Sequence, residues 1–71
     1  RMTEAEIKAW KNGYLIACCN LTNMHDRPCL ASDLLAEAAI TAANVEAMEL
    51  TEYDLRALAK IRTARALDPL S

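Results

Sequence analysis

Apolar residues in the first third of the chain recur with alternating gaps of three and four, which is the spacing of one face of an α-helix. They are Ile7, Trp10, Tyr14, Ala17, Leu21 and Met24. More apolar residues, namely Leu15, Ile16 and Cys19, fall on other faces of the same helix, so that residues 14–19 form a largely apolar run without charge. The pattern predicts a helix that buries two faces, one inside its own fold and one against another molecule.

Capping motifs predict where the first two helices begin. Thr3 and Glu6 have the T-x-x-E pattern of a capping box, in which each side chain accepts a hydrogen bond from the other residue's backbone N–H. The first helix should therefore start at Thr3 and run to about Asn23. Pro28 fits the first turn of a second helix, where its missing N–H costs nothing. The apolar face expected for this second helix consists of Leu30, Leu34, Leu35 and Ala38.

Two threonines mark the helix starts in the second half of the chain. Thr41 is placed to cap a short third segment, and Thr51, followed three residues later by Asp54, is placed to cap the last helix. Asp68 and Pro69 should end that helix. The predicted fold class is therefore all-α, a single helical domain over residues 1–71 with three main helices and a short fourth segment.

The length of the chain bears on how such a fold is stabilised. In a domain of 71 residues one core rarely supplies more than about 3–5 kcal/mol, so disulfides, metals or oligomerisation commonly add to it. Three cysteines are an odd number, and the side chains of the neighbours Cys18 and Cys19 diverge by about 100° on a helix. We therefore expect oligomerisation, as a two-fold homodimer through the first helix. The dimer interface is predicted at Trp10, Tyr14, Leu15, Ile16, Cys18 and Cys19. A glutamate at position 15 or 16 should shift the assembly toward monomer or unfolded chain.

Cysteine and histidine chemistry offers little support for an enzyme or a metal centre. Cys18, Cys19, His25 and Cys29 are possible ligands, but they lack the short regular spacings, such as C-x-x-C, that zinc sites show. A nucleophilic thiol needs a partly exposed, electropositive pocket, for which a small helical domain has little volume. We expect a non-enzymatic protein without cofactor or metal. Free cysteines, together with the lack of a signal peptide or a bilayer-spanning run, favour the cytoplasm.

Charge is unevenly distributed along the chain, although the net charge is only −2. Residues 29–54 contain six acids and no lysine or arginine, whereas residues 55–67 contain four basic residues and no acid. The two segments either complement each other within the fold or steer a partner of opposite charge. The basic residues of the last helix are Arg56, Lys60, Arg62 and Arg65. They support an alternative hypothesis, a small DNA-binding regulator, against which the acidic pI of about 5.2 weighs.

Aromatic and arginine residues dominate the energetics of protein interfaces. Trp10 and Tyr14 have the spacing of core residues, whereas Tyr53 lies in an otherwise polar turn at the start of the last helix. That turn combines an aromatic ring with charges of both signs, so we predict that a protein partner binds there. The predicted contacts are Glu49, Glu52, Tyr53 and Arg56. The alternative is that Tyr53 packs on the fold and that the two charges form an ordinary helix pair.

Three strings of residues resemble small accessory proteins of transposable, Mu-like Pseudomonas phages. They are GYLIACCNL at residues 13–21, NMHDRP at residues 23–28 and LTEYD at residues 50–54. Some of these phage proteins bind and disable host regulators or machinery, among them a quorum-sensing antiactivator and inhibitors of CRISPR complexes or pilus motors. The resemblance implies a phage-encoded inhibitor that binds a host protein, such as a quorum-sensing regulator, in the host cytoplasm. It assigns no role to any individual residue.

Overall fold

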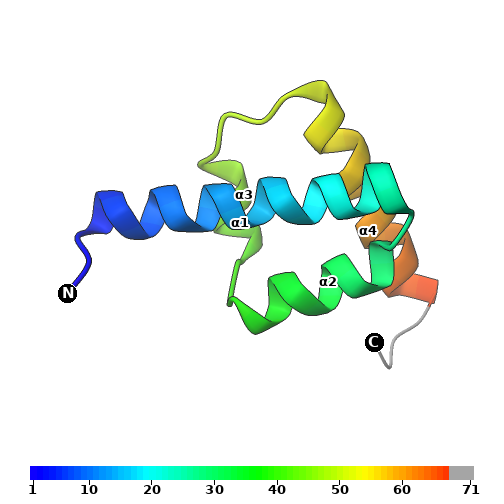
Figure 1. Ribbon diagram of the computed structural model, residues 1–71, viewed down its shortest axis with the longest axis horizontal. Helices are drawn as coiled ribbons and strands as arrows, with labels where there is room; N and C mark the ends of the chain where they lie inside the picture. The colour runs from blue at the N-terminus through cyan, green and yellow to red at the C-terminus, as the bar shows by residue number, and fades with distance from the viewer. Residues whose placement is uncertain (68–71) are drawn as a thin grey trace.

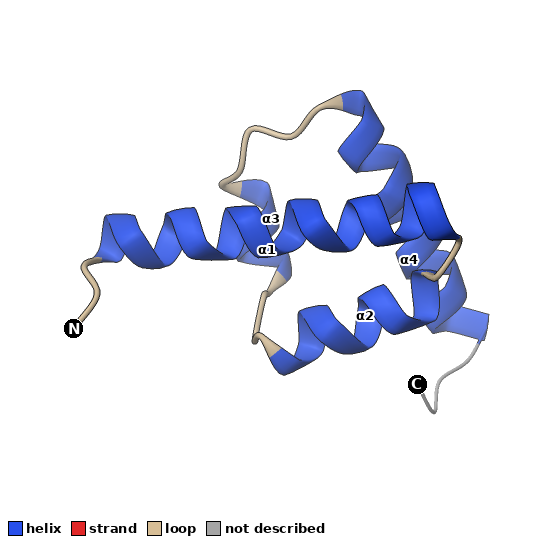
Figure 2. Cartoon of the chain, viewed as in Figure 1, coloured by secondary structure: helices blue, strands red, loops and turns tan. Residues whose placement is uncertain are grey.

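The computed structural model describes residues 1–67, and over this range the chain forms four α-helices and no strand (Figures 1 and 2). The helices are α1 (Glu4–His25), α2 (Pro28–Glu37), α3 (Ala42–Glu46) and α4 (Glu52–Leu67). The prediction of an all-α domain with three main helices and one short segment is confirmed. The predicted stop at Asp68 and Pro69 lies outside the described residues.

Threonine caps begin three of the four helices. The Thr3 hydroxyl accepts a hydrogen bond from the Glu6 N–H at 3.2 Å, and the Glu6 carboxylate accepts one from the Thr3 N–H at 2.9 Å. Thr41 and Asn44 form the same reciprocal pair at the start of α3. Each box satisfies backbone donors that a helix start otherwise leaves free. The caps predicted from the sequence therefore fix the helix boundaries.

The core lies where α1, α2 and α4 pack on one another, while α3 contacts α1 alone. Its buried apolar residues are Leu15, Cys18, Cys19, Ala31, Ala57, Leu58 and Ile61. Only three of these are large aliphatic residues, and the others are small. Small side chains at the contacts let neighbouring helices approach closely. The fully buried centre of the core is therefore thin, and seven partly buried hydrophobic residues pack around it, namely Tyr14, Leu21, Leu35, Ile40, Val45, Met48 and Leu50.

The core-facing side of α1 differs from the one that periodicity predicts. Leu15, Cys18, Cys19 and Thr22 are buried, whereas Trp10 is 47% exposed. The core position expected for Trp10 is therefore wrong, whereas Tyr14 and Leu21 of the same stripe are half-buried against the core. Both sides of the helix are apolar, and α2 and α4 pack on the side that carries the smaller residues. The Thr22 hydroxyl can be buried there because it donates to the Cys18 carbonyl oxygen at 3.1 Å.

The second helix shows the same preference for small residues in the core. Leu30 and Leu34 of α2, predicted on its apolar face, are exposed, whereas Ala31 and Ser32 are buried. The Ser32 hydroxyl accepts a hydrogen bond from the Arg65 guanidinium of α4 at 3.1 Å. This bond satisfies the buried polar group and joins α2 to α4.

The first turns of α1 extend beyond the rest of the molecule (Figure 1). Residues 1–10 are all exposed. The first tertiary hydrogen bond along the helix comes at Lys11, whose ammonium donates to the Asn44 side-chain oxygen of α3 at 3.2 Å. Trp10 is therefore held on a helix with about half of its surface exposed, whereas Ile7 lines a hollow together with Ala43 and Asn44 of α3.

Candidate protein-binding surface

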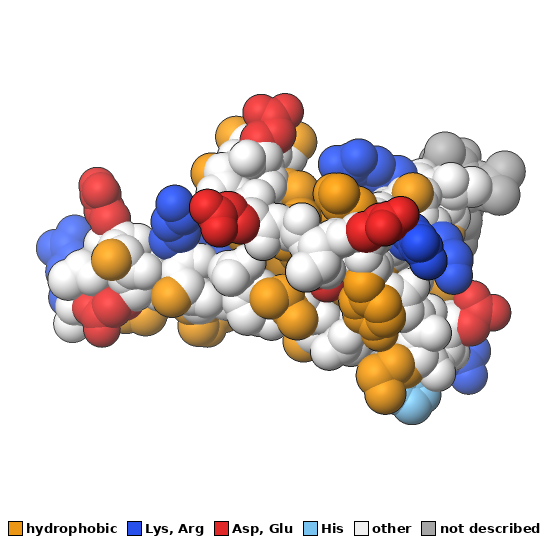
Figure 3. All heavy atoms as spheres, turned by 90° about the horizontal axis from the view of Figure 1, so that it is seen from above, with side chains coloured by type: hydrophobic (Ala, Val, Ile, Leu, Met, Phe, Trp, Pro, Cys, Tyr) orange, Lys and Arg blue, Asp and Glu red, His pale blue; other side chains and the backbone are white. Residues whose placement is uncertain are grey.

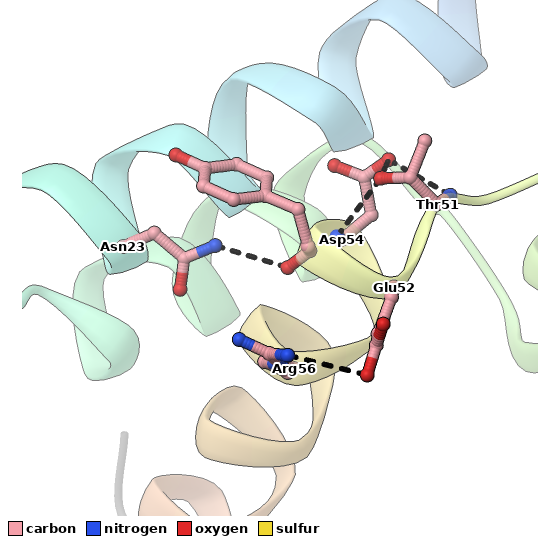
Figure 4. Close-up of polar contacts among 6 residues, drawn as sticks. Asn23, Thr51, Glu52, Asp54 and Arg56 are labelled. Carbon is pink, nitrogen blue, oxygen red and sulfur yellow. Dashed lines mark hydrogen bonds and ion pairs between the residues drawn. The ribbon is translucent and has the colours of Figure 1, made fainter.

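The first turn of α4 is fixed by a third threonine box (Figure 4). The Thr51 hydroxyl accepts a hydrogen bond from the Asp54 N–H at 3.3 Å and donates one to the Asp54 carboxylate at 2.9 Å. The same carboxylate accepts from the Thr51 N–H at 3.3 Å. Asp54 is buried, so its charge is held by these donors and by the helix N-terminus. The predicted cap at Thr51 is confirmed.

Two bonds tie this turn to α1. The Asn23 side-chain amide donates to the Tyr53 carbonyl oxygen at 3.0 Å (Figure 4), and the Cys19 thiol lies 3.7 Å from the Asp54 carbonyl oxygen, to which it donates. The pKa of Cys19 is raised to about 11, mainly by burial of the thiol and to a smaller extent by the charges of Asp54 and Cys18. The thiol therefore keeps its proton and remains a donor at neutral pH. The start of α4 is thus anchored to α1 through the carbonyl oxygens of two consecutive residues.

The predicted partner-binding residues all lie at the surface. Arg56 and Glu52 form an exposed ion pair at 3.2 Å (Figure 4), a kind of pair worth about 0.3–0.5 kcal/mol. Tyr53 is 45% exposed. The structure brings these three residues together in the first turns of α4, and Glu49 lies exposed in the connection that precedes them. One turn further along, Lys60 follows Arg56 at a spacing of four on the same side of the helix.

The structure divides the residues predicted for a dimer interface into two groups. Leu15, Cys18 and Cys19 are buried in the chain's own core, so a second copy could reach them only if that core opened. Trp10 and Ile16 are exposed, and Tyr14 is half-buried. The rings of Trp10 and Tyr14 are stacked at a tilt of 34°, with centroids 5.3 Å apart. This pair, unlike the buried residues, is placed where another molecule can contact it.

The basic residues of α4 are partly neutralised within the fold. The Arg65 guanidinium lies 3.6 Å from the Asp33 carboxylate of α2, and Arg56 pairs with Glu52. Lys60 and Arg62 form no ion pair within residues 1–67. The acidic residues 29–54 and the basic residues 55–67 therefore meet at two exposed pairs, of which Asp33–Arg65 joins α2 to α4, and two cations stay free on the described part of α4.

The possible metal ligands do not assemble in the described part of the chain. Cys18 and Cys19 are buried, Cys29 is half-buried and all three are free thiols, while His25 is exposed. Within residues 1–67 no three His, Cys, Asp or Glu side chains come close enough together to hold a metal ion. In the same range no helix has the length and apolar character needed to cross a bilayer.

A shallow apolar hollow between α1 and α2 was not predicted from the sequence. Tyr14, Ala17, Cys18 and Leu21 of α1 line it together with Leu34 of α2. Tyr14 and Cys18 were predicted at a dimer interface and Leu34 on the apolar face of the second helix, because periodicity defines a face without showing what covers it. The signal that separates a covered face from an open hollow is the exposure of Leu34 and Ala17, which only the packing of the helices sets.

Comparisons with protein-family models, with curated proteins and with solved structures find no match for this chain.

Proposed function

We propose that this chain is a small, non-enzymatic protein-binding module that inhibits its target by stoichiometric binding. The observation that carries the proposal is the half-exposed Tyr53 ring on a backbone that two hydrogen bonds tie to α1. Rigid presentation lowers the entropy lost on binding, and a Tyr beside Arg is the composition of an interface hot spot. The contact residues in this proposal are Glu49, Glu52, Tyr53 and Arg56.

The identity of the target class rests on the resemblance to small phage proteins. In this proposal the chain is encoded by a Mu-like phage, acts in the host cytoplasm and binds a host regulatory protein, such as a quorum-sensing regulator. It does so as a homodimer that associates through α1. Support for the homodimer comes from the thin core and from Trp10 and Ile16, which are large apolar residues left at the surface of that helix.

The test is affinity capture from a bacterial host lysate with the wild-type chain and with the double variant Tyr53→Ala, Arg56→Ala. We expect the wild-type chain to capture one defined host protein in a fixed ratio and the variant to lose it. The melting temperature of the variant should stay within a few degrees of the wild type, because both side chains are exposed. Capture that is unchanged in the variant would remove this surface from the proposal.

A matched control is available on the opposite side of the same helix. Leu55 and Arg62 are also exposed, so Leu55→Ala, Arg62→Ala removes an apolar side chain and an arginine without touching the predicted contacts. This control should retain the target. Loss of the target in both double variants would indicate a general effect of α4 rather than the proposed surface.

A DNA-binding regulator remains the second candidate, because Lys60 and Arg62 are free cations within the described part of α4. Such a protein should retard a DNA duplex at low salt and lose affinity steeply as salt is raised. A protein-binding module should show no retardation. Retardation that Arg62→Ala weakens would favour this second function over the first.

A further inference from the structure

We infer that the segment joining α2 to α4 opens as one unit, while α1, α2 and α4 stay packed on one another. This segment, called here the strap, comprises residues 40–50 and includes α3. It runs from the end of α2 across α1 to the start of α4 (Figure 1). The inference goes beyond the proposed function and does not depend on it, although Glu49 of the proposed contact surface belongs to the strap.

The strap packs on the fold more weakly than the three long helices do. α3 contacts α1 alone, whereas α1, α2 and α4 each contact the other two. No residue of the strap is buried, and its Ile40, Val45, Met48 and Leu50 are half-buried against the core. A segment that buries few apolar contacts opens locally at a low free energy. The strap can therefore detach at a lower free energy than global unfolding requires.

One hydrogen bond joins the strap to α1 within residues 1–67. The Lys11 ammonium donates to the Asn44 side-chain oxygen at 3.2 Å. The same oxygen accepts from the Thr41 N–H at 2.9 Å within the capping box of α3. The capping box and the backbone bonds of α3 join residues of the strap to one another, so they persist when the strap moves as a unit.

Two hollows remain between the strap and α1. Ile7 and Ala43 are among the residues that line the first, and Asn12 and Met48 line the second. The Asn12 side-chain oxygen is buried, yet it accepts no hydrogen bond from residues 1–67. A buried acceptor without a donor costs free energy. Opening of the strap lets water donate to Asn12, which favours the open form.

The end of α2 supplies a hinge. Ala39 directly precedes the strap and has a φ of 55°, in the left-handed region that is unfavourable for alanine. Its N–H donates to the Ala36 carbonyl oxygen, and the Ile40 N–H donates to that of Leu35, which is the bond pattern of a Schellman motif. Glycine is the usual residue at the left-handed position of this motif. Opening lets Ala39 return to a negative φ, so release of this strain also favours the open strap.

The other end of the strap leads into a turn that stays in place. The bonds described above fix the first turn of α4 and tie it to α1. Figure 3 looks down on the connection between α3 and α4, where acidic side chains are exposed. Glu49 belongs to the strap, whereas Tyr53 and Arg56 lie beyond the fixed turn. Opening therefore moves Glu49 relative to the other proposed contact residues, and the contact surface is complete only when the strap is closed.

The test is native-state hydrogen exchange of the full chain, followed by NMR at low denaturant concentrations. The reporters in the strap are the hydrogen-bonded N–H groups of Val45, Ala47 and Met48. We expect these three to share one protection factor, at least tenfold below those of Leu58 and Ile61 in α4, that changes little with denaturant. Protection equal to that of α4, or three unrelated values within the strap, would overturn the inference.

Three variants separate opening of the strap from global unfolding. Lys11→Met removes the bond to Asn44, so the strap should exchange about fivefold faster. Ala39→Gly adopts the left-handed φ without steric cost, so the strap should exchange more slowly. Ile61→Val weakens packing that the open form retains, so α4 should exchange about threefold faster while the strap keeps its rates.

A matched control for the lysine variant is available on α4. Lys60 is an exposed lysine that forms no ion pair within residues 1–67, so Lys60→Met should leave exchange of the strap unchanged. Strap rates that Ile61→Val raises as much as those of α4 would mean that the strap opens only by global unfolding, and would overturn the inference. Strap rates that Lys11→Met leaves unchanged would overturn it as well.

Discussion

The two sides of α1 are both apolar but have different roles in the fold. The inner face, which carries Leu15, Cys18, Cys19 and Thr22, is buried under α2 and α4. The outer face, which carries Trp10, Gly13 and Met24, remains exposed. Trp10 and Met24 are therefore left in water, although Tyr14 and Leu21 of the same apolar stripe are half-buried against the core. The core face of α1 is thus the side on which small residues let α2 and α4 pack closely, and the size of the available side chains matters less.

The inner face also holds polar groups that only the assembled fold satisfies. The Cys19 thiol donates to a carbonyl oxygen of α4, and the Thr22 hydroxyl donates within α1. The side chains of the outer face are exposed and largely apolar, so they do not depend on hydrogen bonds within the fold. Substitutions on the two faces should consequently act on different properties, namely the free energy of unfolding on the inner face and association on the outer face.

The sharpest way to test this comparison is to truncate neighbouring residues that point to different sides. Leu15 is fully buried, so Leu15→Ala should lower the free energy of unfolding by about 2–5 kcal/mol. Ile16 is exposed, so Ile16→Ala should change it by no more than about 0.5 kcal/mol. Urea denaturation followed by circular dichroism measures both. Equal losses would show that the two faces do not differ as described. Leu15→Glu should unfold the chain, whereas Ile16→Glu should leave the monomer folded.

Alkaline pH should lower the free energy of unfolding through Cys19, which lies on the inner face. The folded chain raises the pKa of Cys19 from 9.0 to about 11 through burial, so the unfolded chain loses this proton first as the pH rises. The free energy of unfolding should be at its full value below pH 9 and fall by about 2–3 kcal/mol as the pH approaches 11. Denaturation at a series of pH values measures the slope. Cys19→Ala should flatten it, and an unchanged slope in that variant would contradict the assignment.

The Thr51 cap begins α4, which packs on the inner face. This cap should contribute less to the free energy of unfolding than Leu15 or Cys19 does. Thr51→Ala removes the hydroxyl that accepts from the Asp54 N–H and donates to its carboxylate, at an expected cost of about 1 kcal/mol. Thermal melting measures the loss. Thr51→Ser keeps the hydroxyl and should restore most of the stability. If the serine variant were as unstable as the alanine variant, the threonine methyl group rather than the cap would account for the effect.

The smallest expected effect on folding lies at the outer face and has the opposite sign. Gly13→Ala adds a methyl group into open space and removes the flexibility of glycine, so it should raise the free energy of unfolding by up to about 1 kcal/mol. Denaturation at a concentration where the chain is monomeric measures the gain. A loss of stability would mean that Gly13 is needed by the monomer itself.

Local sequence signals account for the helices and for part of the candidate binding surface. The threonine caps and Pro28 predicted the helix starts because capping bonds join residues that are only three apart. Glu52 and Arg56 were predicted as neighbours because they are one helical turn apart. Tyr53 was expected to be exposed because the residues around it are polar. The anchoring of this turn by Asn23 and Cys19 of α1 was not predicted, since it joins residues more than 29 positions apart.

The sequence by itself determined the number of helices, their starts and the excess of apolar residues on α1. It could not determine which apolar side of α1 or α2 is buried, because periodicity defines a face without saying what packs on it. That choice was made by the tertiary structure, in which Ala31, Ala57 and the adjacent cysteines allow the helices to pack closely. The larger side chains of Trp10 and Leu34 remain at the surface, where another molecule can cover them.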